Sequence, residues 1–132
     1  MITLLADHNM EGQAKLLFQT LQELGWVELL DLRLTTFAEV GLVASNTDRI
    51  VWRRAQELGM LLLTDNRNKS GSSSLEQTLL NEATDKALPT LTISRVQRLM
   101  TDPAYREACA ERVAEIVIDL ETYRGVPRLY IP

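Results

Sequence analysis

Short apolar runs alternate along this chain with stretches in which apolar residues recur every three or four positions, and this alternation strongly constrains the fold. A short apolar run is typical of a strand buried on both faces of a sheet, whereas the three- or four-residue spacing is typical of a helix with one buried side. The runs predict strands at Ile2 to Ala6, Val27 to Asp31, Met60 to Thr64 and Pro89 to Ile93, with a terminal edge strand at Arg128 to Ile131.

Helical patterns fill the gaps between these strands. Glycines stop two of the predicted helices, and both of these helices end in the tripeptide Glu-Leu-Gly, directly before an apolar run. Capping residues open the others, because Ser and Asp side chains accept hydrogen bonds from the first backbone N–H groups of a helix. The predicted segments are residues 14–24 before Gly25, a turn at 35–40, residues 45–58 opened by Ser45 to Asp48, a helix opened by Ser73 and Ser74, and a long helix opened by Asp102-Pro103.

Strands that alternate with helices form a parallel sheet whose two faces are covered by the connecting helices. We therefore expect an α/β protein, a three-layer α/β/α sandwich with a mainly parallel sheet of four to five strands. No linker or repeat divides the sequence, so residues 1–132 are expected to form one domain.

Composition excludes several classes of protein. No apolar run is long enough to cross a membrane, and the first seven residues lack the basic start of a signal peptide, so a cytoplasmic protein is expected. The single cysteine, Cys109, lies in an apolar helical stripe, which favours a buried packing role. A net charge of −4 argues against a general nucleic-acid-binding surface. A local basic patch is still compatible with this net charge, because 11 of the 14 cationic residues are arginine, which binds phosphates well.

Acidic residues gather at one end of the predicted sheet. Asp7 follows the first strand and Asp65 the Met60 to Thr64 strand, while Asp48 and Glu76 lie in the first turns of helices that begin at the same end. Sites in open α/β sheets form beyond the carboxyl ends of the strands. Carboxylates held together need a cation, and oxygen ligands suit Mg²⁺ or Mn²⁺, so the pattern predicts metal-assisted phosphodiester hydrolysis. Asp31, at the end of the predicted second strand, is a further candidate for this edge.

Other interpretations account for part of this pattern. Acids in a first helical turn stabilise the helix dipole without any site, which covers Glu76 and much of Asp48 but not Asp7. His8 is more typical of a residue beside a site than of a general base. The sequence contains no phosphate-binding loop, dinucleotide-binding motif, paired cysteines or serine-nucleophile motif, so zinc chemistry and cysteine or serine nucleophiles are poorly supported.

Two motifs resemble the PIN-like domains, a family of compact metal-dependent ribonucleases, and in particular its small stand-alone bacterial members. The first is Leu5-Ala6-Asp7-His8-Asn9 at the end of a strand. The second is a helix opened by Ser45 to Asp48, stopped by Gly59, and followed by the strand Leu61-Leu62-Leu63-Thr64. The resemblance covers roughly residues 1–95.

The resemblance implies that residues 1–132 form a single PIN-like domain with Mg²⁺- or Mn²⁺-dependent endoribonuclease activity. Such a protein could be the toxin of a toxin–antitoxin pair, with RNA as substrate and an antitoxin protein as partner. Asp7, Asp48 and Asp65 would be catalytic and, with Glu76, would hold the metal. The expected substrate-binding residues are Asn9, Asn66, Asn68, Arg49 and Arg67.

The chain departs from the family at the third acidic position. Family members commonly carry aspartates two and four residues after the threonine that ends the strand, where this sequence has Asn66 and Asn68. Two alternatives to the ribonuclease therefore stay open: a degenerate PIN-like module that binds RNA or a protein partner, and an enzyme that acts on small nucleotides. A homodimer formed through the apolar tail at Leu129 to Ile131 is also an expectation.

Overall fold

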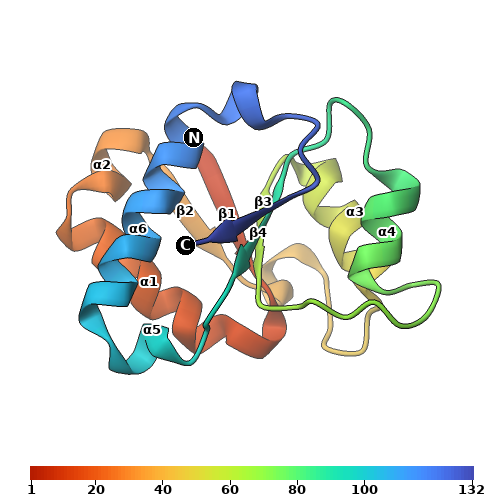
Figure 1. The fold of residues 1–132 in the computed structure, drawn as a ribbon, viewed down its shortest axis with the longest axis horizontal. Coiled ribbons are helices and arrows are strands. Elements are labelled where there is room, and N and C mark those ends of the chain that lie inside the picture. The colour runs from red at the N-terminus through yellow and green to blue at the C-terminus, as the bar shows by residue number, and fades with distance from the viewer.

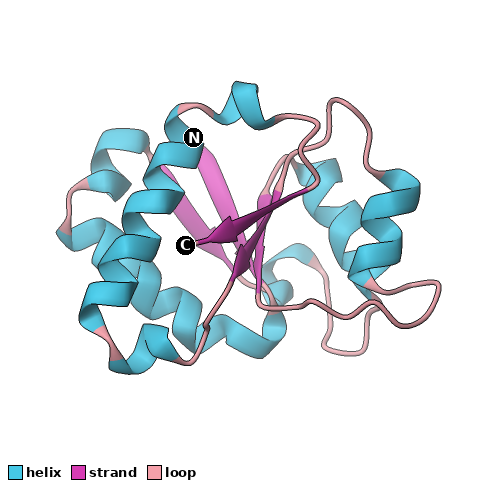
Figure 2. Ribbon diagram, viewed as in Figure 1, coloured by secondary structure: helices cyan, strands magenta, loops and turns pink.

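A five-stranded parallel sheet forms the centre of the protein in a computed structural model that describes all 132 residues (Figures 1 and 2). The strands are hydrogen-bonded in the order β2-β1-β3-β4-β5, and every neighbouring pair is parallel. Their bounds are β1 Ile2–Ala6, β2 Leu32–Thr35, β3 Leu61–Thr64, β4 Thr90–Ile93 and β5 Arg128–Ile131.

Helices cover both faces of this sheet, as the α/β/α expectation required. Helices α1, α2, α5 and α6 lie on one face, and α3 and α4 lie on the other (Figure 1). The bounds are α1 Glu11–Glu23, α2 Trp26–Leu30, α3 Asp48–Leu58, α4 Leu75–Glu82, α5 Arg98–Thr101 and α6 Pro103–Ile118, with short 3₁₀ turns at η1 His8–Met10, η2 Phe37–Val40 and η3 Leu120–Tyr123.

Alternation along the central strands divides the apolar core in two. Leu4 and Leu63 point into the larger cluster, under α1 and α6, whereas Leu5 and Leu62 point into the smaller one, under α3 and α4. Successive side chains of a strand face opposite sides, so a sheet covered on both faces needs uninterrupted apolar strands. The predicted strands at both ends of the chain and at residues 60–64 and 89–93 are thereby confirmed to within a residue.

Cys109 lies in the larger core cluster and is fully buried. Burial raises the pKa of its thiol to about 11, so the thiol stays protonated and unreactive at neutral pH. The predicted packing role is confirmed.

The predicted strand at Val27 to Asp31 is wrong, because this segment forms helix α2. Gly25, in the left-handed conformation, begins α2 instead of leading into a strand, and β2 starts only at Leu32. Trp26, Val27 and Leu30 pack on the larger cluster, a spacing that places them on one side of a helix. A five-residue apolar run is too short for its period to separate helix from strand.

The helix predicted at residues 45–58 is α3, and it starts later than predicted. One further helix, α5, was not predicted. Thr47, not Ser45, caps α3, and its hydroxyl accepts from the backbone N–H of Ile50 at 3.4 Å. Asp48 is therefore the first helical residue. The predicted starts at Ser74 and Asp102 are confirmed, since each side chain accepts a hydrogen bond from the backbone of its helix. The four-residue helix α5 had no sequence signal.

Gly125, just before β5, is the glycine whose replacement should cost most. Its φ is +89°, and an added Cβ would lie 2.8 Å from the carbonyl oxygen of Asp85. We expect Gly125→Ala to lower the free energy of unfolding by about 3 kcal/mol, because left-handed strain of about 1–2 kcal/mol adds to the steric clash. Urea denaturation measures this. Gly25→Ala, with a similar φ of +87° and open space around it, should show the strain alone; equal losses for the two variants would contradict the clash.

No helix in the structure is both long enough and apolar enough to cross a membrane.

Candidate functional site

The order of the strands creates a crevice at the carboxyl ends of β1 and β3. The chain leaves β1 through α1 to reach β2 on one side, and then returns through α3 to β3 on the other side of β1. Connections that diverge on opposite faces leave an opening between the two central strands, and ligands of open α/β sheets bind there. Asp7 follows β1, and Thr64 ends β3 at the same edge.

Asp7 is held firmly at this opening. Its backbone N–H donates to the carbonyl of Leu63 at 2.9 Å, and its Oδ2 accepts from the hydroxyl of Thr64 at 2.6 Å. Burial raises the pKa of Asp7 above its ordinary value of 3.8, and the negative charges of Asp65 and Asp48 raise it further, against the hydrogen bonds from Thr64 and the Asn9 backbone. The raised pKa reflects a carboxylate that is partly removed from water and lies near two other acids.

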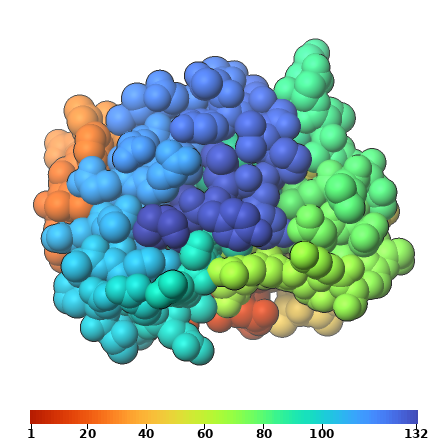
Figure 3. All heavy atoms as spheres, viewed as in Figure 1, coloured from red at the N-terminus to blue at the C-terminus, as the bar shows by residue number.

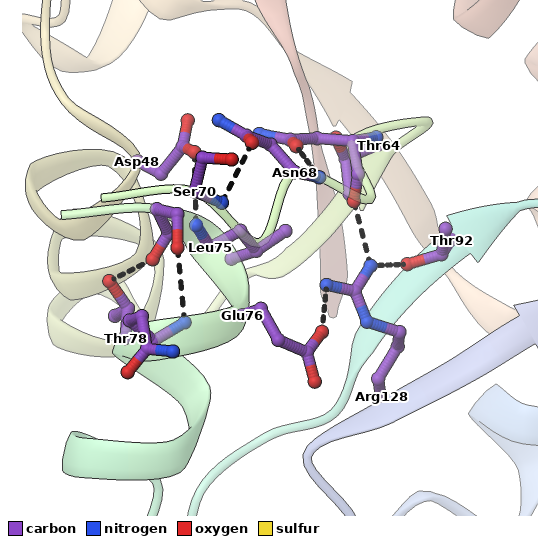
Figure 4. A network of polar contacts seen from close by, with 12 residues as sticks. Asp48, Thr64, Asn68, Ser70, Leu75, Glu76, Thr78, Thr92 and Arg128 are labelled. Carbon is purple, nitrogen blue, oxygen red and sulfur yellow. Dashed lines mark hydrogen bonds and ion pairs between the residues drawn. The ribbon is translucent and has the colours of Figure 1, made fainter. Parts of the chain in front are cut away.

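Asp48 reaches the same opening from α3. As the first residue of that helix it lies where a carboxylate is favoured by the helix dipole, and its Oδ2 also accepts from the N–H of Leu75, the first residue of α4, at 3.0 Å (Figure 4). One oxygen of Asp48 therefore joins two helix starts. This structural role coexists with a place in the lining of the pocket.

A small pocket of about 70 Å³ brings the two carboxylates together. A water molecule needs roughly 10–15 Å³ of such space, so the pocket has room for an ion and a few waters but not for a nucleotide. Its polar lining consists of Asp7, Asp48, His8, Asn9, Asn46 and Asn66, and its apolar lining includes Phe37, Val51, Leu62 and Leu75. No lysine or arginine lines it.

Two of the three amide side chains that line the pocket already accept hydrogen bonds. Asn66 Oδ1 accepts from the N–H of Asn68 at 2.8 Å, and Asn46 Oδ1 accepts from the N–H of Val43, also at 2.8 Å. These bonds shape the two loops around the pocket. The carboxylates are consequently the strongest oxygen donors that the pocket offers to a cation.

Of the four acids expected to converge, the structure brings together Asp7 and Asp48. Asp65, half-buried beside them, does not line the pocket and acts on Asp7 through its charge. Glu76 faces away and forms an ion pair with Arg128 at 3.4 Å. No three or more Asp, Glu, His or Cys side chains are grouped so that they could hold a metal ion by themselves. Asp31 lies at the opposite, amino edge, where its carboxylate is 3.7 Å from the N-terminal amine.

The expected substrate-binding residues separate into two groups. Asn9 and Asn66 line the pocket, whereas Asn68 lies in an adjoining polar groove of about 270 Å³ that also contains Asp48. Arg49 is held elsewhere, with Nη2 donating to the carbonyl of Ser72 at 2.6 Å and Nε 3.2 Å from Glu82. Arg67 donates to the carbonyl of Ser94 beyond β4. Neither arginine lines the pocket.

His8 lies at the pocket as a half-exposed residue, and its Nδ1 is 3.5 Å from a carboxylate oxygen of Glu11. Its ring lies 5.8 Å from that of Phe37, which forms part of the apolar wall.

Arg128 is the site-associated residue that the sequence did not reveal. Its side chain is only 8% exposed. Its Nη1 donates to the carbonyl of Asn66 at 2.8 Å and to the hydroxyl of Thr92 at 2.6 Å, and its Nη2 lies 3.4 Å from Glu76 (Figure 4). Arg128 thus ties the edge strand β5 to the loop beside the pocket. The available signal was an arginine at the start of an otherwise apolar terminal run.

Comparisons of this chain with protein-family models, with curated proteins and with solved structures found no match.

Proposed function

We propose that this protein is a ribonuclease of the PIN-like type that depends on a divalent cation, Mg²⁺ or Mn²⁺. The observation that carries the proposal is the meeting of Asp7 and Asp48, from two different elements, in one small pocket at the crevice between β1 and β3. A pair of half-buried carboxylates with no lysine or arginine in the pocket is costly unless a cation joins them.

The donor set of the pocket fits such a cation. Mg²⁺ is bound in proteins through one or two carboxylates, keeps several of its waters and takes its remaining ligands from substrate phosphates. Asp7 and Asp48 would hold it, and the pocket volume of about 70 Å³ leaves room for waters. When bound, the metal would lower the pKa of a water and offset the charge of the phosphate.

The residues around the carboxylates would position them for this role. The Thr64 hydroxyl fixes one oxygen of Asp7, and the Leu75 N–H fixes one oxygen of Asp48, so neither carboxylate has to be ordered when a cation arrives. Asp65 adds a third negative charge nearby, which favours a cation in the pocket. Outer partners of this kind typically change metal affinity or activity about 10- to 100-fold.

A degenerate PIN-like module that binds RNA or a protein partner is the second candidate. It is favoured by the amide side chains of Asn66 and Asn68, whose oxygens accept backbone hydrogen bonds within the loop, and by the lack of a third carboxylate in the pocket. Such a module would bind its partner at the same pocket and would not cleave RNA. The role of toxin in a toxin–antitoxin pair would follow from RNA cleavage and is part of the first proposal.

Metal-dependent stabilisation separates the two candidates. With EDTA-treated protein, Mn²⁺ at 100 times its dissociation constant should raise the free energy of unfolding by about 2.7 kcal/mol. For a chain of this size the thermal midpoint should rise by roughly 8–12 °C. Cleavage of a 5′-labelled single-stranded RNA should then appear with Mn²⁺ and disappear with EDTA. If millimolar Mn²⁺ neither shifts the midpoint nor supports cleavage, the metal-dependent ribonuclease is contradicted and the degenerate module is favoured.

A further inference from the structure

The pocket of Asp7 and Asp48 leaves most of an RNA substrate without a binding site. Its volume of about 70 Å³ accepts an ion, waters and phosphate oxygens, whereas binding sites for small organic ligands usually measure about 300–1,000 Å³. Under the proposed function, the bases flanking the cleaved phosphate must therefore bind outside the pocket.

An open groove of about 300 Å³ lies between α4 and β5, on the sheet face that α3 and α4 cover. Its apolar walls are Leu79, Leu80 and Pro127, and its polar groups are Glu76, Arg128 and the phenol of Tyr130. Leu80 is 70% exposed and Tyr130 is 50% exposed. Figure 3 shows the C-terminal residues (dark blue) at the surface, beside the segment that leads from β3 to α4 (lime to green). The groove thus offers an aromatic ring and apolar contacts to solvent.

Cations flank the ring of Tyr130. The guanidinium carbon of Arg67 lies 5.6 Å from the ring centroid, and that of Arg128 lies 5.9 Å from it. Arg67 also donates to the carbonyl of Ser94, which places it next to Arg95, an exposed arginine that forms no ion pair. Arg67 has no acidic partner either. An exposed aromatic ring among cations is the combination with which proteins bind single-stranded nucleic acids.

One residue connects the groove to the pocket. The side chain of Asn66 lines the pocket, while its backbone carbonyl accepts from Arg128, which lines the groove. The two sites are therefore neighbours across a single loop. The polar groove around Asn68 is also adjacent, but it contains no apolar or aromatic side chain on which a base could stack.

We infer that the groove between α4 and β5 binds a nucleobase of single-stranded RNA, stacked on Tyr130, while Arg67 and Arg95 contact the phosphates next to it. This inference rests on the proposed function and specifies its substrate as a single strand. A second copy of this chain is the other candidate occupant. It is disfavoured because a symmetric interface centred on this groove would bring these cations close to the same cations of the partner.

Binding of a labelled single-stranded RNA to EDTA-treated protein, measured by fluorescence anisotropy, tests the inference without cleavage. Tyr130→Ala should weaken binding about 5- to 100-fold, the usual effect of losing one base stack, whereas Tyr130→Phe should bind as the wild type does. With an oligonucleotide that lacks bases, the Tyr130→Ala variant and the wild type should bind equally. The matched control is Tyr123→Ala, which removes a tyrosine that also contacts an arginine (Arg112, 5.7 Å) but lies in η3, at the other end of β5.

Unchanged RNA binding by Tyr130→Ala would overturn the inference. If that variant also turned a dimer into a monomer in light scattering, the groove would be an interface between copies. Failure of the proposed function looks different: RNA would bind in a Tyr130-dependent way but would not be cleaved with Mn²⁺. Cleavage without any dependence on Tyr130 would leave the ribonuclease intact and remove only the base site.

Discussion

Replacing Asp7 by Asn is expected to lower the rate of RNA cleavage by more than about 100-fold, because even residues outside the ligand shell of a metal contribute about 10- to 100-fold. The change removes one charge and keeps the shape, and the new amide oxygen can still accept from Thr64 as the carboxylate does at 2.6 Å. Initial rates on a labelled single-stranded RNA with saturating Mn²⁺ measure the effect.

The same variant should be more stable than the wild type in the absence of metal. Burial raises the pKa of Asp7, so the folded protein holds this proton more tightly than the unfolded chain does. The stabilisation from the protonated form is complete below pH 3.8 and is lost as pH rises through the folded pKa. At pH 7.5 in EDTA, the thermal midpoint of Asp7→Asn should therefore exceed that of the wild type, and Mn²⁺ should reverse the order.

Asp31→Asn is the matched control, because it removes the same charge at the opposite edge of the sheet. Its backbone φ of 51° is one that Asn also tolerates, and its carboxylate is exposed. It should cleave RNA at the wild-type rate and respond to Mn²⁺ normally. Full activity of Asp7→Asn would disprove the assignment of the pocket, and equal losses in both variants would point to a general charge effect.

Replacing Arg128 by Met is expected to cause the largest loss of stability among side-chain changes near the site. The variant would leave the buried hydroxyl of Thr92 and the carbonyl of Asn66 without their donor, and Glu76 without its cation. Each buried polar group left unpaired costs about 1–3 kcal/mol. We expect about 2–3 kcal/mol less free energy of unfolding in urea, after allowing for the 34% exposure of Glu76.

Arg124→Met provides the comparison for Arg128. Arg124 forms an ion pair with Glu121 at 2.6 Å and donates to the carbonyl of Lys86 at 3.0 Å, but both contacts are at the surface, and the Arg124 and Glu121 side chains are 37% and 80% exposed. An exposed pair contributes about 0–1 kcal/mol, so this variant should lose less than about 1 kcal/mol. If Arg128→Met were no less stable than Arg124→Met, the buried hydrogen bonds would not hold β5 to the loop after β3.

Most of the architecture was predictable because its signals are local. Uninterrupted apolar runs such as Leu61 to Thr64 suit strands buried on both faces, and Asp102 followed by Pro103 begins a helix through its own backbone geometry. The place of Asp7 could also be predicted, because the residue after a central parallel strand lies at the carboxyl edge wherever the other elements go.

The segment from Val27 to Asp31 shows where local signals end. Its apolar residues suit a strand and a short helix equally. The choice depends on packing against α1, the preceding helix, and against α6, which is far away in the sequence. This difference affects the candidate site. Asp31 was expected at the carboxyl edge of the sheet, but the structure places it at the amino edge.

For the candidate site, the order of residues along the chain shows which strand ends carry acids, whereas the packing of the elements selects the acids that meet. Asp48 joins Asp7 because α3 and α4 begin at the same opening, while Glu76 turns to Arg128, a residue 52 positions away in the chain. Spacing along a helix or strand is set by bonds between near neighbours. The direction in which a charged side chain turns depends instead on the partner that folding brings to it, because a half-buried charge must find an opposite charge or hydrogen bonds.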